Sequence, residues 1–322
     1  MKKKYYIGID GGGTYTKVVA VDESGIVVCD ATGDTINFNA VPFAQAQHNL
    51  QRALAQIALR VPFKQVDSIF IGCSALDGEA DDETTRKLLG EYAYLPSKMS
   101  SDLYIALLGH TLDKSGVLIV SGTGSMAIAR DDTGRILTCG GWGYGIGDEG
   151  SAYDIAVKGI SAAIRYYDGL DQPTQLYDGL LEFYHLSHIK ELIPCIYQPQ
   201  LNRQKIAGFA VVVSRCAQSG DLVAQGILCD AALVLSKMAC TLLARTSIST
   251  NIAVYGGVFQ NCLYVRQKFV EQLEKYDANI EVVAPELPPE IGAVIAAMME
   301  KRVTISPHIL HNLHLYCNGR FE

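Results

Sequence analysis

Residues 5–28 read YYIGIDGGGTYTKVVAVDESGIVV, and residues 116–138 repeat the same order of features as GVLIVSGTGSMAIARDDTGRILT. Each copy has a short apolar run, a glycine-rich turn with a threonine, a second apolar run, an acidic turn that ends in glycine, and a third apolar run. The runs are short and rich in β-branched residues, so we expect strands joined by hairpin turns. This internal repeat predicts two domains that each begin with a three-stranded meander.

The segments that follow each meander alternate between helix and strand. The spacing of apolar residues predicts helices over 43–60, 84–89, 103–108, 151–167, 206–217, 222–244, 261–275 and 289–299. Short apolar runs predict further strands over 68–72, 98–101, 252–255 and 280–283. We therefore expect an α/β fold with two domains, 1–112 and 113–322, and a ligand in the cleft between them.

Length and composition agree with two packed domains. The chain has 322 residues, of which 49% are hydrophobic and 19% charged, as in a globular protein. A net charge of -7 argues against a nucleic-acid binder, and the absence of a long apolar stretch argues against a transmembrane helix. Nine cysteines occur singly, without a CxxC pair, so we expect reduced thiols in a cytoplasmic protein rather than disulfides or a zinc site.

The glycine-rich turn of each repeat is a candidate phosphate site. The two turns are Asp10-Gly11-Gly12-Gly13-Thr14 and Ser121-Gly122-Thr123-Gly124-Ser125. Glycine tolerates positive φ and has no side chain, so backbone N–H groups can approach an anion closely. Thr14 adds a hydroxyl, and Asp10 could hold Mg²⁺ through water. One turn alone could be a plain tight turn, but two in equivalent positions predict a polyphosphate site. Neither turn matches a P-loop or a Rossmann fingerprint.

A third glycine patch, Gly256-Gly257-Val258-Phe259-Gln260-Asn261, follows an expected strand and opens a helix. Such a junction suits a nucleotide base and ribose that lie against the backbone. A plain strand-to-helix turn is the alternative interpretation.

Together with the stretch GGWGYGIGDEGSAY at 140–153, these turns resemble the actin/Hsp70/sugar-kinase superfamily. More narrowly, they resemble the N-acetylglucosamine kinase branch of the BadF/BadG/BcrA/BcrD ATPase family, over about residues 5–299. The resemblance implies two ribonuclease H-like (actin-like ATPase) domains with an interdomain cleft. It also implies a homodimer that uses ATP and Mg²⁺ to phosphorylate a sugar, N-acetylglucosamine, at O6.

The resemblance also implies roles for individual residues. Asp102 matches the catalytic carboxylate, which accepts the hydroxyl proton as attack proceeds; from the residues alone, a helix N-cap at Asp102 stays open. Nucleotide contacts are implied at Gly11, Gly12, Gly13, Thr14, Gly122, Thr123, Gly124, Gly208, Gly256, Gly257 and Asn261, and a metal contact at Asp10. Sugar contacts are implied at Asn37, Asp102, Ser125, Met126, Gly141, Trp142, Gly143 and Asp148. Relatives often carry Asn at the positions of Ser101 and Met126, so the exact sugar stays open.

Other functions remain as alternatives. The kinase could act on glucosamine, N-acetylmuramic acid or glucose. An activator ATPase of a 2-hydroxyacyl-CoA dehydratase would carry a cysteine shortly before the second glycine turn, where residues 118–121 are Leu-Ile-Val-Ser. A sugar-responsive regulator would carry a helix-turn-helix before the first turn. His308, His311 and His314 recur at every third position, which we interpret as a surface segment. We therefore expect a small-molecule sugar as partner, and neither nucleic acid nor membrane.

Overall fold

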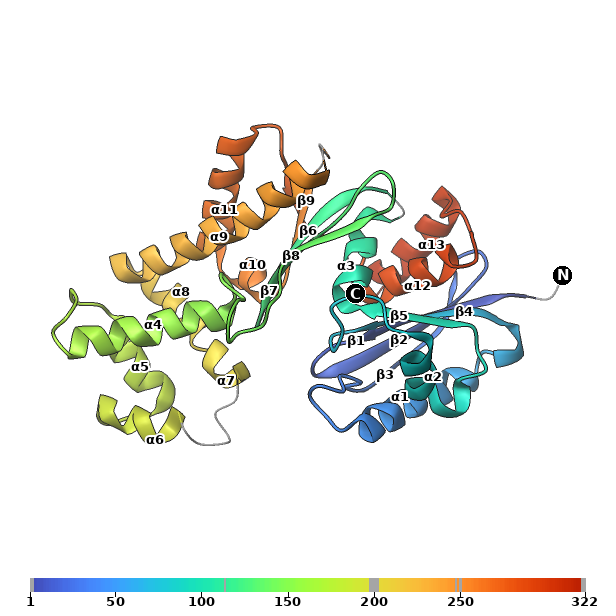
Figure 1. Ribbon diagram of the computed structural model, residues 1–322, viewed down its shortest axis with the longest axis horizontal. Helices are drawn as coiled ribbons and strands as arrows, with labels where there is room; N and C mark the ends of the chain where they lie inside the picture. Colours follow the sequence, from blue (N-terminus) through green and yellow to red (C-terminus); the bar gives the residue numbers. More distant parts are fainter. Residues whose placement is uncertain (1–2, 113, 197–202, 247, 249–250, 320–322) are drawn as a thin grey trace. The chain divides into compact units, whose positions relative to one another are not determined.

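The computed structural model describes residues 3–112, 114–196, 203–246, 248 and 251–319 of the chain (Figure 1). The chain divides into two compact units, of which the first comprises 1–116 with 285–322 and the second comprises 117–284. Each unit contains a five-stranded mixed sheet and helices that cover it. The predicted α/β fold with an internal repeat is therefore confirmed.

The first sheet has the strand order β3-β2-β1-β4-β5. Its strands are β1 (Tyr5–Gly11), β2 (Tyr15–Asp22), β3 (Val27–Asp34), β4 (Val66–Cys73) and β5 (Ser97–Ser101). β1 pairs with β2 in antiparallel and with β4 in parallel, and β4 pairs with β5 in parallel. The carboxyl ends of the three parallel strands therefore meet at one edge of the sheet, where Asp10 is the second-last residue of β1 and Asp102 follows β5.

Helices cover both faces of this sheet. They are α1 (Phe43–Ala58), α2 (Asp82–Leu89), α3 (Asp102–Thr111), α12 (Pro289–Met299) and α13 (Pro307–Asn318), with short 3₁₀ turns η1 (Phe63–Gln65) and η2 (Gly90–Tyr92). Because side chains alternate along a strand, Ile7 and Ile9 of β1 point into the core under α1 and α2. Tyr6 points to the other face, where α3, α12 and α13 form a second core. Gly8 and Asp10 share that second face, because alternate residues of a strand point to the same side.

Residues 285–322 belong to the first unit, although we expected 113–322 to form the second domain. Ile291, Val294 and Met298 of α12 are buried in the core of the first unit, as are Ile309 and Leu313 of α13. The Leu287 N–H donates a hydrogen bond to Gly109 O at 2.8 Å, close to the point where the chain comes back to the first unit. The domain prediction was wrong here because helical spacing reveals an apolar face and not the sheet against which that face packs.

The second sheet has the order β10-β9-β6-β7-β8, which is the strand order of the first sheet read from the other edge. Its strands are β6 (Gly116–Ser121), β7 (Ser125–Arg130), β8 (Ile136–Gly140), β9 (Ile252–Tyr255) and β10 (Val282–Val283). Its helices are α4 (Ala152–Tyr167), α5 (Leu176–Tyr184), α6 (Leu192–Ile196), α7 (Arg203–Ala207), α8 (Ala210–Gln218), α9 (Leu222–Thr246), α10 (Gly257–Asn261) and α11 (Leu263–Tyr276), with η3 (Ile189–Glu191). The helices predicted over 206–217 and 261–275 are each broken in two, at Gly208 and at Cys262.

α9 is long and apolar enough to cross a membrane by length and composition alone, contrary to the expectation that no helix would be. Half of its most apolar window is buried inside the protein. Leu228, Leu235 and Leu242 lie in the core of the second unit. We therefore describe α9 as the central core helix of that unit, a role that explains its composition.

Candidate functional site

The first unit gathers three carboxylates and one lysine at the carboxyl edge of its sheet. Asp10 near the end of β1 stands directly opposite Lys17 of β2 in the antiparallel register. The Lys17 ammonium lies 3.1 Å from Oε1 of Glu290, in the first turn of α12. Asp102 and Glu290 are both close enough to Asp10 for their negative charge to raise the pKa of its carboxyl group.

Asp102 is the first residue of α3, and the helix is capped by its neighbour. The Ser101 hydroxyl accepts a hydrogen bond from the Tyr104 N–H at 3.2 Å, the usual bond of an N-cap residue. Asp102 could have been the helix cap or the catalytic carboxylate; the structure gives the cap to Ser101. Burial raises the pKa of Asp102 to about 6, while the backbone N–H groups of Leu103 and of Asp102 itself act in the opposite direction. A carboxyl group of that pKa is ionised at neutral pH and can accept a proton.

Asp10 has the chemistry of a cation ligand. Burial, with the charges of Glu290 and Asp102, raises its pKa to about 7, and Lys17 lowers it. Its carboxylate has no hydrogen-bond partner within the described part of the chain. The described residues also contain no cluster of three acidic, histidine or cysteine side chains that could hold a metal. A cation at Asp10 would therefore take its other ligands from phosphate and water, which is how Mg²⁺ usually binds. The residues present fit Mg²⁺.

The glycine turns are needed for space and not for unusual backbone angles. None of the glycines at 11–13, 122 and 124 has a positive φ, so that part of the argument from sequence was wrong. A Cβ atom at Gly11 would lie 2.4 Å from Cγ1 of Ile36, so this glycine lets the chain pack closely. At Gly13 and Gly122 a Cβ atom would meet nothing within 4 Å. There the backbone is open to an approaching ligand, and the neighbouring Thr14 is exposed.

Asn37 lies in the same unit, next to the first turn. Its Oδ1 accepts from the Asn39 N–H at 2.8 Å and its Nδ2 donates to the Ser74 hydroxyl at 3.0 Å. Thr35 donates to Gly12 O at 2.7 Å and ties this loop to the turn. Because an amide has two donor hydrogens and an oxygen with two lone pairs, Asn37 keeps one position of each kind for a ligand.

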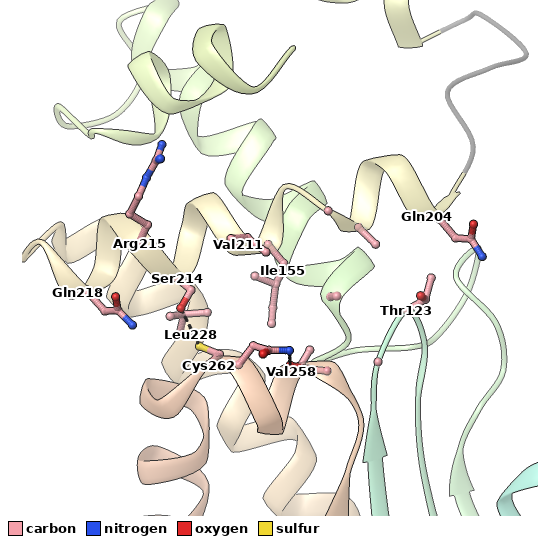
Figure 2. Close-up of a pocket in the computed structure, with 17 residues that line it drawn as sticks. Thr123, Ile155, Gln204, Val211, Ser214, Arg215, Gln218, Leu228, Val258 and Cys262 are labelled. Carbon is pink, nitrogen blue, oxygen red and sulfur yellow. Dashed lines mark hydrogen bonds between the residues drawn. The ribbon is translucent and has the colours of Figure 1, made fainter. Parts of the chain in front are cut away.

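The second unit contains a cavity of about 510 Å³ (Figure 2), a size typical of small-molecule sites. Five residues with an implied nucleotide contact line it: Gly122, Thr123, Gly208, Gly257 and Asn261. Apolar side chains form much of the remaining wall, among them Ile155, Val211, Leu228 and Val258. Ser214 and Gln218 of α8 add polar groups at one end of the cavity, as Figure 2 shows. The geometry suits an aromatic base against apolar walls, with phosphates toward the second glycine turn.

Close packing at two glycines shapes the surroundings of this cavity. Gly256 has φ 102°, and a Cβ atom there would lie 2.4 Å from Ser121 O. The turns after β6 and β9 therefore touch through their backbones, and α10 begins directly after them at Gly257. Gly124 packs against the side chains of Asp148 and Arg203, which a Cβ atom would approach within 2.8 and 2.7 Å.

The loop that carries Asp148 is tied to the second turn. The Ser121 hydroxyl donates to Gly150 O at 2.8 Å, and the Ser125 hydroxyl donates to Glu149 O at 2.7 Å. Asp148 is only 4% exposed, has φ 61° and forms an ion pair with Arg203. The Ser125 side chain thus holds the loop by a hydrogen bond within the protein, and Asp148 is paired with the cationic Arg203.

Of the remaining residues with an implied sugar contact, Gly141, Trp142 and Gly143 lie along the same loop, and Met126 belongs to β7. The Met126 side chain packs against Gly141, where a Cβ atom would lie 2.6 Å from the sulfur. Trp142 is 76% exposed, and a Cβ atom at Gly143 would meet nothing within 4 Å. An exposed indole beside open backbone is suited to cover an apolar face of a sugar ring.

Three charged residues at these sites were missed by the sequence analysis. Lys17 had a signal, because the hairpin that pairs Gly11 with Thr16 also pairs Asp10 with Lys17. Glu290 had no such signal, because it lies 273 residues from its partner Lys17. Arg203 had none either, because it lies 55 residues from its partner Asp148. Only the tertiary structure brings these partners together.

Comparison with known proteins adds to this geometry. The BadF/BadG/BcrA/BcrD ATPase family matches the chain over residues 7–297. An N-acetylmuramic acid/N-acetylglucosamine kinase of Clostridium acetobutylicum is 31% identical over 305 residues, covering 92% of this chain and 99% of the relative. An N-acetyl-D-glucosamine kinase of Dictyostelium discoideum is 27% identical and covers 94% and 100%.

A solved structure shares the fold. A crystal structure from Chromobacterium violaceum superimposes with a TM-score of 0.71 at 24% sequence identity, over 91% of this chain and 98% of that one. With the two matching sheets, this likeness confirms the predicted pair of actin-like ATPase domains.

Proposed function

The chain belongs to the BadF/BadG/BcrA/BcrD ATPase family and is a sugar kinase, and we propose that it transfers the γ-phosphate of ATP to an amino sugar. The sugar that we favour is N-acetylglucosamine, phosphorylated at O6. Both relatives described above are named as kinases of this sugar, and each matches the chain over nearly its whole length. The predictions of a homodimer and of a cytoplasmic location stay predictions.

The single structural observation that carries the mechanism is the state of Asp102. Its carboxylate lies in the first turn of α3, where Ser101 is the residue that caps the helix, so Asp102 does not serve as the cap. Burial raises the pKa of the Asp102 carboxyl group to about 6. A sugar hydroxyl held beside it would pass its proton to Asp102 as the oxygen attacks phosphorus. The attacking oxygen becomes more nucleophilic as the proton leaves, and the new P–O bond forms while the bond to the leaving ADP breaks.

The nucleotide would bind through the residues that line the cavity of the second unit. The base would lie against Ile155, Val211 and Leu228, and the phosphates would lie along the backbone of Gly122 and Thr123. Asp10 would hold Mg²⁺, which neutralises phosphate charge when it is bound. The first glycine turn would also offer N–H groups to phosphate oxygens.

The sugar would be recognised by hydrogen bonds and by an aromatic surface. Asn37 keeps a donor and an acceptor position for hydroxyl groups, and Asp148 supplies a carboxylate. Trp142 offers its exposed ring. Met126 cannot hydrogen-bond a hydroxyl as an asparagine would, so the acceptor panel in the assay includes related sugars.

The activator ATPase is the alternative from another class. It would need thiolates for an iron–sulfur cluster. The strand that leads into the second glycine turn, β6 (Gly116–Ser121), contains no cysteine. The kinase interpretation is therefore preferred.

A coupled ADP-release assay with Mg²⁺-ATP tests the proposal. The acceptors are N-acetylglucosamine, glucosamine, N-acetylmuramic acid, N-acetylmannosamine and glucose. Turnover that depends on an acetamido sugar is the expected result. ATP hydrolysis that is the same with and without every sugar would overturn the proposal.

A further inference from the structure

The Ser214 hydroxyl group has an uncommon partner in the cavity of the second unit. Ser214 lies on α8, lines the cavity and is 8% exposed. Its hydroxyl group donates a hydrogen bond to the Cys262 sulfur at 3.4 Å, as Figure 2 shows. Cys262 also lines the cavity and lies between α10 and α11. The bond therefore ties α8 to the end of α10, at the end of the cavity that is farther from Thr123 (Figure 2).

This bond fixes what the Ser214 oxygen can offer a ligand. Hydroxyl groups inside helices often donate to the carbonyl group one turn earlier. Ser236 and Thr241 of α9 do so, with bonds of 2.8 Å to Leu233 O and Lys237 O. The hydrogen of Ser214 instead points away from its own helix, toward sulfur. Within the described part of the chain the Ser214 oxygen accepts no hydrogen bond, so its two lone pairs are available while its hydrogen is in use.

The other polar groups near this end of the cavity have partners elsewhere or no fixed character. Arg215 forms an ion pair with Glu182 at 2.9 Å. The Asn261 amide donates to a carbonyl group of its own helix at 2.9 Å. Gln218 is exposed, and its amide can turn over and act as donor or acceptor. Among the described residues that line this end, Ser214 is therefore the group whose hydrogen-bonding character is fixed.

Purine bases differ in what they present to such a group at C6. Adenine has an amino group, which is a donor, whereas guanine and hypoxanthine have an oxo group, which is an acceptor. An amino group can donate to the Ser214 lone pairs. An oxo group would meet acceptor with acceptor, unless Ser214 turned its hydrogen away from Cys262. The bond to sulfur therefore sets the size of the discrimination, which is moderate because sulfur is a weak acceptor.

We propose that Ser214 is a specificity-determining residue that favours a purine nucleotide with an amino group at C6, and that Cys262 is the positioning residue that orients the Ser214 hydroxyl group. This inference rests on the proposed function for the presence of a nucleotide in the cavity. The apolar walls would hold any purine, and the Ser214 lone pairs would distinguish one from another. Cys262 would act only through Ser214.

The experiment compares nucleotides that differ at C6, without sugar and without turnover. Isothermal titration calorimetry measures the Mg²⁺ complexes of ADP, IDP and purine riboside diphosphate, which carry an amino group, an oxo group and hydrogen at C6. IDP lacks the C2 amino group of GDP, so the change from ADP is confined to C6 and the adjacent N1. Each nucleotide is titrated into wild type, Ser214→Ala, Cys262→Ala and Cys262→Ser.

Ser219→Ala is the matched control. The Ser219 hydroxyl group follows α8 and donates to Arg215 O at 3.1 Å, and Ser219 does not line the cavity. Thermal unfolding monitors the fold of every variant.

We expect wild type to bind ADP about 3- to 10-fold more tightly than either analogue, which is the worth of one neutral hydrogen bond. In Ser214→Ala both affinity ratios should be about 1. In Cys262→Ala the Ser214 hydrogen is free to meet an oxo group, so the ratio of ADP to IDP should fall to about 1. The ratio of ADP to purine riboside diphosphate should persist in that variant. Cys262→Ser keeps an acceptor for Ser214, so both ratios should persist there, as in Ser219→Ala.

Equal affinity of wild type for ADP and IDP would overturn the inference, as would wild-type ratios in Ser214→Ala. A wild-type ratio of ADP to IDP in Cys262→Ala would overturn the positioning role of Cys262. If Cys262→Ala does not fold, wild type and Ser214→Ala decide, because equal ratios in these two proteins would also overturn the inference.

Failure of the proposed function gives a different result. Wild-type protein that binds none of the three diphosphates would overturn this inference together with the proposed nucleotide site. Wild-type protein that binds them with the expected ratios, but shows no sugar-dependent turnover, would overturn the proposed kinase activity and leave the selectivity for the base in place.

Discussion

The Arg203 guanidinium forms an ion pair with the carboxylate of Asp148, which lies 55 residues earlier in the chain. The Arg203 side chain also lies over the ring of Tyr144, with 5.1 Å between its guanidinium carbon and the ring centroid. Arg203 begins α7, and the next residue, Gln204, lines the nucleotide-sized cavity. The pair therefore joins the loop proposed to bind sugar to a helix that borders the proposed nucleotide site.

We expect Arg203→Ala to raise the KM for the sugar about tenfold, because it leaves Asp148 buried without its cation and free to move. The KM for ATP should change less. Arg165→Ala is the matched control, since Arg165 forms an exposed ion pair with Asp171 in the same unit. Steady-state kinetics with each substrate varied in turn provide the measurement. An unchanged sugar KM in Arg203→Ala would separate Asp148 from sugar binding.

Asp102→Asn should lower turnover by several orders of magnitude while the melting temperature stays near that of wild type. The amide keeps the size of the side chain but cannot accept the hydroxyl proton. Ser101→Ala should show the reverse pattern: it removes the N-cap bond to Tyr104 and costs about 1 kcal/mol of stability, with turnover largely kept. Near-normal turnover in Asp102→Asn would leave Asp102 without a catalytic role.

The rate of the reaction should depend on pH through the same carboxylate. Burial raises the pKa of Asp102 to about 6, and only the ionised form accepts a proton. We therefore expect kcat to be nearly constant above pH 7 and to fall tenfold per pH unit below about pH 6. A profile measured from pH 5 to 8.5 checks this. A rate that stays flat down to pH 5 would show that the base has an ordinary pKa or is another group.

Asp10→Asn should stabilise the protein at pH 8 in the absence of Mg²⁺ and nucleotide. The pKa of Asp10 is raised to about 7 in the folded chain, first by burial and then by Glu290 and Asp102. A carboxyl group whose pKa is raised in the folded state makes the protein more stable at low pH than at high pH. This stability is fully present below the unfolded pKa of about 4 and is lost as the pH rises through 7. At pH 8 the wild-type protein therefore contains a buried negative charge that destabilises it, whereas the Asp10→Asn variant does not.

We expect this gain to be about 2–4 kcal/mol at pH 8 and to vanish near pH 4, where Asp10 is protonated in both states. Urea unfolding at the two pH values measures it. Equal stability of the two proteins at pH 8 would contradict the raised pKa of the Asp10 carboxyl group.

Val211→Trp should block the cavity of the second unit and raise the KM for ATP at least tenfold. Val211 lines the cavity and is 69% exposed, so the larger ring can be accommodated without repacking the core. Leu222→Trp is the matched control, because Leu222 is 73% exposed in the same unit but does not line this cavity. An unchanged KM for ATP in Val211→Trp would remove the cavity as the nucleotide site.

Much of the fold could be predicted because its signals are local. The meanders at 5–28 and 116–138 form β1–β3 and β6–β8, since alternating β-branched residues and glycine turns act within a few residues. Boundaries shifted where a helix is interrupted, as at Gly208 and the buried Phe209, because packing and not propensity decides such breaks. The predicted helix at 289–299 and the segment at 307–318, for which no helix was predicted, were placed in the wrong domain, because nothing local identifies the surface against which they pack.

The sequence by itself determined the repeat, the turns that bear glycine, and the candidate base Asp102, because each depends on neighbouring residues and on motifs. Only the tertiary structure decided which charges meet: Glu290 with Lys17, Arg203 with Asp148, and both Asp102 and Glu290 beside Asp10. It also decided that Ser101 is the helix cap and that the glycines of the turns serve close packing and open backbone. The physical reason is that charge–charge energies and steric contacts depend on distance in space, which separation along the chain does not reveal.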